Sequence, residues 1–235
     1  MTRPFARVLG AFVPPAVRRR LREWLPDGRT PAKRFGAIYR DAYWGGREQD
    51  FYSGHGSHTP AVIGPYVSAV RAFLASRPSA PVVVDVGCGD FVASGRLVDL
   101  ARSFVACDVV PDLIDGNRRR FVRVHLTFTV LDAIADPLPP GDVVIVKQVL
   151  QHLSNADIGV IVGKLAQYPT WIVCEHVPAG TFVANLDKPT DGDTRLPRRS
   201  GVVLTEAPFR VRARKTVLCE PASEGAIIRT VAYEF

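Results

Sequence analysis

The chain has 235 residues, of which 47% are hydrophobic and 23% are charged. This composition is that of an ordinary globular protein, and it excludes a disordered, collagen-like or coiled-coil chain. No run of 18 apolar residues occurs, so the sequence predicts no membrane-spanning helix. The length suits one large domain.

The net charge of +7 is concentrated at the N-terminus. Residues 1–40 carry a net charge of +8, whereas residues 41–235 carry −1, so we expect no nucleic-acid partner for the body of the protein. We interpret residues 1–30 as a basic arm with a short amphipathic helix, Ala16 to Leu25. Such a helix can lie on an anionic membrane surface, dock on a partner or stay solvated, and the sequence leaves these alternatives open.

The cysteines show neither a CxxC pair nor a zinc pattern. Each lies in or beside an apolar run, which predicts reduced, buried thiols and a cytoplasmic location, with peripheral membrane contact as the alternative that the basic arm adds. The four are Cys88, Cys107, Cys174 and Cys219. The acidic residues of the segment 178–201 lack a calcium-loop spacing, so we expect no metal site.

We assign residues 31–235 to a single domain with two parts. Residues 31–78 predict an N-terminal helical cap: helical spacing in 31–44, then a glycine-rich loop, then a helix from Thr59 and Pro60 to about residue 76. Residues 79–235 predict a sheet that binds a cofactor.

Strands and helices alternate from residue 81 onward, which is typical of βαβ units and a parallel sheet. The expected strands are 81–86, 104–108, 124–130, 142–147 and 171–175, and the expected helices are about 93–101, 111–121 and 155–167. Residues 178–201 predict a long loop. Two more strands, 209–219 and 226–235, have only a turn between them and predict a closing antiparallel hairpin.

A glycine turn follows the first buried strand, with the pattern Asp85-x-Gly87-x-Gly89. Glycines at such a turn let the backbone approach a ligand closely, and the N-terminus of a following helix favours a polar or anionic group. Ligands of open α/β sheets bind at the carboxyl ends of the strands, where this turn lies.

Polar residues also end the next strands. Asp108 lies 19 residues after Gly89, where a carboxylate can accept hydrogen bonds from both hydroxyls of a ribose; capping a helix is the alternative role. Asp132 follows the third strand and can face an adenine amino group or simply lie in a loop. The segment 147–154 ends the fourth strand and is a candidate for contact with cofactor or substrate.

These motifs resemble class I S-adenosylmethionine-dependent methyltransferases over about residues 60–235: the D-x-G-x-G turn, Asp108, Leu131-Asp132-Ala133, the run V-L-x-H-L at 149–153 and the closing hairpin. A narrower similarity, to a poorly characterised bacterial branch of that family, begins at about residue 35. It rests on these residues: Phe35, Ile38-Tyr39, Trp44, Ser53-Gly54-x-Gly56-Ser57, Cys88-Gly89-Asp90-Phe91, Asn185-x-Asp187, Gly192, Arg195 and Ala207-Pro208-Phe209. The resemblance implies a Rossmann-like fold: a mostly parallel seven-stranded sheet that ends in an antiparallel hairpin, with helices on both faces. It also implies S-adenosylmethionine as the cofactor.

The resemblance implies a role for each matched residue. Asp85, Gly87 and Gly89 would form the cofactor turn, Asp108 would hold the ribose and Asp132 would face the adenine. Gln148 would lie beside the methionine moiety and Ser57 near its carboxylate. Two positions depart from the family: Phe91 replaces the usual third glycine, and Gln148 stands where the narrower branch often has an acid.

The predicted activity is methylation of a hydroxyl on a small molecule or glycan, for which a base must take the proton. His152 is the first candidate base, because it follows the fourth strand. His176 is the second, and His55 and His58 are weaker candidates. A group of arginines in the late loop can clamp an acidic acceptor or can form a solvated face: Arg195, Arg198 and Arg199.

Two other functions remain open. An NAD-dependent oxidoreductase would also use a glycine turn and an acid at the position of Asp108, but the pattern here is not G-x-G-x-x-G. A non-catalytic scaffold that binds S-adenosylmethionine would keep the turn and lack an acceptor pocket. The sequence does not identify the acceptor or the oligomeric state.

Overall fold

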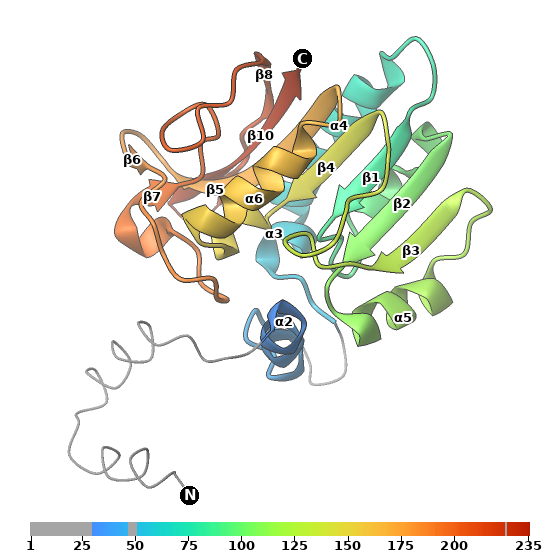
Figure 1. Cartoon of the computed structure of the whole chain (residues 1–235), viewed down its shortest axis with the longest axis horizontal. Coiled ribbons are helices and arrows are strands. Elements are labelled where there is room, and N and C mark those ends of the chain that lie inside the picture. Colours follow the sequence, from blue (N-terminus) through green and yellow to red (C-terminus); the bar gives the residue numbers. More distant parts are fainter. Residues whose placement is uncertain (1–29, 47–50, 224) are drawn as a thin grey trace, which may run out of the picture. The chain divides into compact units, whose positions relative to one another are not determined.

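A central sheet forms the middle layer of the computed structural model, which describes residues 30–46, 51–223 and 225–235 (Figure 1). The basic arm predicted for residues 1–30, with its helix, falls almost entirely outside these residues. The strands are β1 (Val82–Val86), β2 (Ser103–Asp108), β3 (Leu126–Val130), β4 (Val143–Lys147), β5 (Thr170–Pro178), β8 (Arg214–Cys219), β9 (Ala222–Ser223) and β10 (Ala226–Glu234). They follow the order β3-β2-β1-β4-β5-β10-β8, and β9 pairs with β10 beside this path.

The sheet is parallel from β1 to β5 and antiparallel at its far end. Strand β10 runs antiparallel to β8, because a short turn rather than a helix joins these two strands, and it lies between β8 and β5 and is antiparallel to both. The seven-stranded sheet with a closing hairpin is therefore confirmed.

Helices cover both faces of the sheet, as predicted. The helices of the described residues are α2 (Pro31–Arg40), α3 (His55–His58), α4 (Pro60–Ala75), α5 (Pro111–Arg120) and α6 (Asn155–Leu165), of which α2 and α3 lie at the carboxyl ends of the strands. Because successive side chains of a strand point to opposite faces, Val83 packs with the apolar face of α4, whereas Val84 packs with that of α6. Burial on both faces explains why the strands are continuously apolar.

Several predicted elements differ from the structure, and the strand expected at 209–219 begins only at Arg214. The helix expected at 93–101 is a pair of 3-10 turns, η1 (Ser94–Arg96) and η2 (Val98–Leu100). Gly95 lies in the first of these turns, and glycine disfavours a continuing α-helix. The late loop contains η4 (Leu196–Arg198) and a small parallel sheet, β6 (Val183–Ala184) with β7 (Ser200–Gly201).

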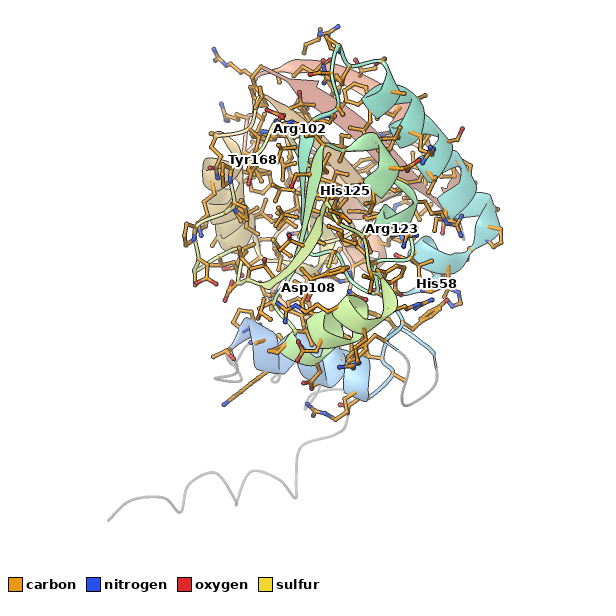
Figure 2. The ribbon with its side chains drawn as sticks, turned by 90° about the vertical axis from the view of Figure 1, so that its right-hand side faces the viewer. His58, Arg102, Asp108, Arg123, His125 and Tyr168 are labelled. Atoms are coloured by element: carbon orange, nitrogen blue, oxygen red, sulfur yellow. The ribbon has the colours of Figure 1, made fainter. Side chains whose placement is uncertain are left out.

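The carboxyl ends of the parallel strands lie on the side of α2. Figure 2 shows Asp108 at this end of β2, while Arg102, which precedes the strand, lies at the opposite end. In Figure 1 the arrowheads of β1 and β2 point toward α2. Among the described residues, no helix is long and apolar enough to cross a membrane.

Candidate active site

A cavity of about 310 Å³ lies at the carboxyl ends of β1, β2 and β4. Its walls come from α2, the segment 53–57, the glycine turn after β1 and the segment after β4. His58 and the three arginines of the late loop do not line it, whereas nine of the residues singled out from the sequence do: Ser57, Asp85, Gly87, Gly89, Asp108, Asp132, Gln148, His152 and His176. The structure therefore brings to one place residues that are up to 119 positions apart.

The glycine turn is needed for both its conformation and its size. Gly87 and Gly89 have φ angles of 74° and 54°, in the left-handed region. A Cβ on Gly87 would collide with the side chain of Val149, and one on Gly89 would collide with the hydroxyl of Ser53. The segment after β4 and the cap thus pack directly against this turn.

Asp108 is buried at the end of β2 with its carboxylate beside the cavity. One oxygen accepts the backbone N–H of Gly89 and the other that of Val110, each at 3.1 Å. Burial raises the pKa of Asp108 to about 6, and the backbone N–H groups oppose this rise. Each carboxylate oxygen can accept a second hydrogen bond, so the group retains capacity for a ligand.

Asp85 is buried at the end of β1, and neither of its carboxylate oxygens has a hydrogen-bond partner among the described residues. Burial raises its pKa to about 7, while the nearby Ser94 hydroxyl and Lys147 ammonium act in the opposite direction. A buried carboxylate with no donor is suited to a cationic or hydrogen-bond-donating ligand.

Asp132 lies just after β3, and its side chain accepts hydrogen bonds from the backbone of its own loop. One of its oxygens accepts the backbone N–H of Ile134 at 2.9 Å and of Ala135 at 3.4 Å. Its predicted contact with adenine stays a prediction, although the residue lines the cavity.

Asp90, the first residue after the glycine turn, fastens the cap to that turn. Its carboxylate accepts the backbone N–H of Ser53 at 2.8 Å and lies 2.6 Å from Nε2 of His58. In return, the hydroxyl of Ser53 accepts the backbone N–H of Asp90 at 2.9 Å. His58, a weaker candidate base, is therefore engaged at the cap and stacks on Tyr52, whereas His55 lines the cavity.

Phe91 occupies the position of the family's third glycine and keeps a glycine-like backbone, with φ at 61°. Its side chain is fully buried and meets three other phenylalanine rings edge-on. This aromatic packing compensates for a backbone conformation that disfavours a side chain.

Lys147 is a buried cation at the end of β4, which the sequence indicated only as part of the segment 147–154. Its ammonium donates to Oε1 of Gln148 at 2.8 Å and to the hydroxyl of Ser57 at 2.9 Å. Burial lowers its pKa. The signal that points to it is a charged residue that ends an otherwise apolar strand, Val143–Lys147.

His152 has both ring nitrogens engaged. The backbone N–H of His176 donates to Oε1 of Gln151, which orients the amide so that Nε2 of Gln151 donates to Nε2 of His152 at 3.1 Å. Nδ1 of His152 then donates to the carbonyl of Asp193 at 3.2 Å. Burial and the nearby Lys188 lower the pKa of His152 to about 4. In this arrangement the lone pair of Nε2 already accepts a hydrogen bond from Gln151 and is not free to take a proton from a methyl acceptor. The geometry therefore does not favour His152 as the base.

Arg195 is fully buried, so neither role expected for it holds: it is not a clamp for an acceptor, and it is not solvated. Its guanidinium donates to the carbonyls of Leu150, Gln151, Leu153 and Leu186 and to the side chain of Asn155. The carboxylate of Glu175 accepts the backbone N–H groups of Leu150 and Gln151, two of the residues whose carbonyls Arg195 binds. Burial raises the pKa of Glu175 to about 8. Arg195 and Glu175 therefore shape the segment after β4.

The thiols are free, but only half of them are fully buried. Cys107 and Cys174 lie inside the sheet, whereas Cys88 and Cys219 are half-buried. Within the described part of the chain, no group of three His, Cys, Asp or Glu side chains is placed to hold a metal ion.

Comparison with known proteins rests on structure, since no protein-family model and no curated protein matches the sequence. A SAM-dependent methyltransferase from Leishmania major aligns over 91% of this chain and 89% of its own, with a TM-score of 0.61 and 17% identity. The N-methyltransferase NodS from Bradyrhizobium japonicum, in complex with S-adenosyl-L-homocysteine, aligns over 77% and 90%, with a TM-score of 0.57 and 12% identity.

The chain has the class I methyltransferase fold. The magnesium protoporphyrin IX methyltransferase ChlM from Synechocystis, solved with S-adenosylhomocysteine, agrees: it aligns over 84% and 92% of the two chains, with a TM-score of 0.55 and 17% identity. The methyltransferase-like strand order and the reversed β10 confirm the fold expected from the sequence motifs.

Proposed function

We propose that this methyltransferase-fold protein transfers a methyl group from S-adenosylmethionine to a hydroxyl of a small molecule or glycan. The observation that carries the proposal is the charge of the cavity. Its described lining contains the carboxylates of Asp85, Asp90, Asp108 and Asp132, one cation, Lys147, and no arginine. S-adenosylmethionine carries a sulfonium and an ammonium, so its net positive charge suits this lining.

The same lining argues against a dinucleotide. A pyrophosphate is usually bound by the N-terminus of the α-helix that follows the glycine turn. Here two 3-10 turns replace that helix, and Asp90 places a carboxylate directly after the turn. An oxidoreductase that uses NAD is therefore the weaker alternative.

The cofactor residues divide by chemistry. Asp108 has the acceptor capacity for the ribose hydroxyls, and we assign Asp132, which lines the same cavity, to the adenine. Asp85 offers an unpartnered carboxylate to a cationic group. The bound cofactor supplies an activated methyl group on its sulfonium, so the protein has only to position the acceptor and accept its proton.

We assign to the acceptor a group of lining side chains that includes no lysine, arginine or carboxylate: Trp44, His55, Gln148, His176 and Thr194. A neutral hydroxyl compound suits this lining better than a phosphate or carboxylate, since Arg195 is buried elsewhere. Both nitrogens of His152 are engaged, so we keep His176 and His55, which also line the cavity, as candidate bases beside it.

Calorimetric titration with S-adenosylhomocysteine, with NAD in a parallel cell, tests the cofactor. We expect micromolar binding of S-adenosylhomocysteine alone, and a loss of about 100-fold or more in Asp108→Ala, because two charge-assisted hydrogen bonds are removed. Asp112→Ala, which removes an exposed carboxylate from α5, serves as the matched control. Binding of NAD alone would overturn the proposal.

Turnover distinguishes an enzyme from a scaffold. The assay follows formation of S-adenosylhomocysteine from S-adenosylmethionine with pooled sugar and phenol acceptors, and separately with pooled amines. Turnover with the hydroxyl pool supports the proposal. Turnover with the amine pool alone would correct the acceptor class, and cofactor binding without turnover in any pool would favour the scaffold.

A further inference from the structure

Lys147 and Asp85 are buried, oppositely charged groups at the floor of the cavity, and neither has an ion-pair partner within the described part of the chain. The ammonium of Lys147 meets only neutral acceptors, on Gly56, Ser57 and Gln148. Burying an unpaired charge is costly. Two such charges in one cavity indicate a ligand that carries both signs.

The sheet fixes the spacing of the two groups. In the parallel pairing of β1 and β4, Asp85 lies opposite Ile145, and Lys147 lies two residues further along on the same face. Strands about 4.8 Å apart with a rise of about 3.3 Å per residue place the two Cα atoms about 8 Å from each other. The Nζ atom of Lys147 lies 5.5 Å from the centroid of the Tyr66 ring, and Tyr66 belongs to α4, which covers this face.

The chemistry of the pair selects its ligand. A phosphate would be repelled by Asp85, a simple amine would be repelled by Lys147, and a hydroxyl compound would leave both charges unpaired. An α-amino acid carries its ammonium and its carboxylate on one carbon, and it can therefore face both groups at once.

We propose that Lys147 and Asp85 clamp the amino-acid end of S-adenosylmethionine, with Lys147 on the carboxylate and Asp85 on the ammonium. Lys147 is then the residue that distinguishes the cofactor from adenosine derivatives that lack a carboxylate. This assignment rests on the proposed function. It extends the expected role of Ser57 near the carboxylate of the cofactor, because the Ser57 hydroxyl lies 2.9 Å from the ammonium of Lys147.

A purely structural role for Lys147 makes a different prediction. Ser57 and Gly56 belong to α3, and Gln148 has a left-handed backbone with φ at 55°, so the ammonium also joins the cap to the end of β4. If that were its whole role, its loss would weaken every ligand of the cavity equally. The carboxylate clamp predicts that its loss weakens only ligands with a carboxylate.

The test compares S-adenosylmethionine with decarboxylated S-adenosylmethionine, which keeps the nucleoside, the sulfonium and the ammonium. By calorimetry we expect wild type to bind the intact cofactor at least about 30-fold more tightly, as a charge-assisted contact would give. In Lys147→Met we expect that preference to fall below about threefold, with the decarboxylated ligand little changed. Lys215→Met, an exposed lysine of β8, should keep the wild-type preference.

Each outcome has a distinct meaning. Equal weakening of both ligands in Lys147→Met would overturn the clamp in favour of the structural role. Equal binding of both ligands by the wild-type protein would overturn the clamp without the use of a variant. The proposal can therefore be tested even if Lys147→Met does not fold. 5′-Methylthioadenosine separates the two proposals: if wild type binds it as tightly as S-adenosylmethionine, the clamp fails while the nucleoside site stands, and if neither binds, the proposed function fails too.

Discussion

At the ends of β1 and β2, the buried carboxylates of Asp85 and Asp108 keep hydrogen-bonding capacity toward the cavity. In the segment 150–155 after β4, by contrast, the buried polar groups have their hydrogen bonds satisfied within the protein: Arg195 donates to carbonyls, Glu175 accepts backbone N–H groups, and His152 has both nitrogens engaged. The first region is organised to receive a ligand at a cost in stability. The second is organised to hold a loop in shape. Being buried and polar is therefore not enough to assign a residue to binding.

Removing Arg195 gives the largest expected effect and tests the second region. Arg195→Met leaves several buried carbonyls without a donor and the carboxylate of Glu175 without its nearby cation, so we expect the free energy of unfolding to fall by about 3–5 kcal/mol. Arg198→Met, which removes an exposed guanidinium bonded to one carbonyl, should change it by less than about 1 kcal/mol. Urea titration of both variants measures the difference, and similar losses in the two would contradict the comparison.

Asp85→Asn should have a smaller effect on the free energy of unfolding than Arg195→Met, and it should raise this energy rather than lower it. The folded pKa of Asp85 is about 7, above its usual range, so the unfolded chain releases this proton first and stability falls as the pH rises from about 4 to 7. At pH 8 the neutral amide should therefore increase the free energy of unfolding by about 1–3 kcal/mol, and at pH 4 it should change little. The same variant should bind S-adenosylhomocysteine about 30-fold more weakly. A loss of stability at pH 8 would show that the buried carboxylate does not destabilise the ligand-free protein.

The positions of the residues that belong to sequence motifs could be predicted, because they depend on the local sequence pattern. Asp85 and Asp108 end apolar strands, and the spacing of strands in a βαβ unit brings them together. The engagement of Asp90 with Ser53 and of Arg195 with Leu150 joins residues 37 and 45 positions apart, and no local pattern reports such contacts. The helix expected after the glycine turn fails for a similar reason: tertiary packing of Phe91 and a glycine at position 95 decide the backbone there.

The pH dependence of binding gives a smaller effect in wild type. If Asp85 faces the ammonium of the ligand, S-adenosylhomocysteine should bind about tenfold more tightly at pH 8 than at pH 6, because the ionised fraction of a group with a pKa of about 7 rises by that factor. 5′-Methylthioadenosine has no ammonium and should lack this dependence. Calorimetry at the two pH values measures both ligands. A flat profile for S-adenosylhomocysteine would separate Asp85 from the ammonium and weaken the contrast between the two regions.

His152 provides the smallest and most local test, because it follows a single imidazole in the unaltered protein. Its hydrogen bonds require the tautomer with hydrogen on Nδ1, and burial with Lys188 nearby sets its pKa at about 4. Nitrogen-detected NMR of the imidazole should therefore show a neutral ring with Nδ1 protonated down to about pH 5. An imidazole so hard to protonate is a weak proton acceptor near neutral pH, which is why the base for a hydroxyl acceptor is better sought at His176 or His55. If instead the ring titrated near its usual pKa of about 6.5, with hydrogen on Nε2, His152 would be open toward the cavity. The segment after β4 would then receive a ligand as the ends of β1 and β2 do, and the contrast between these two regions would fail at His152.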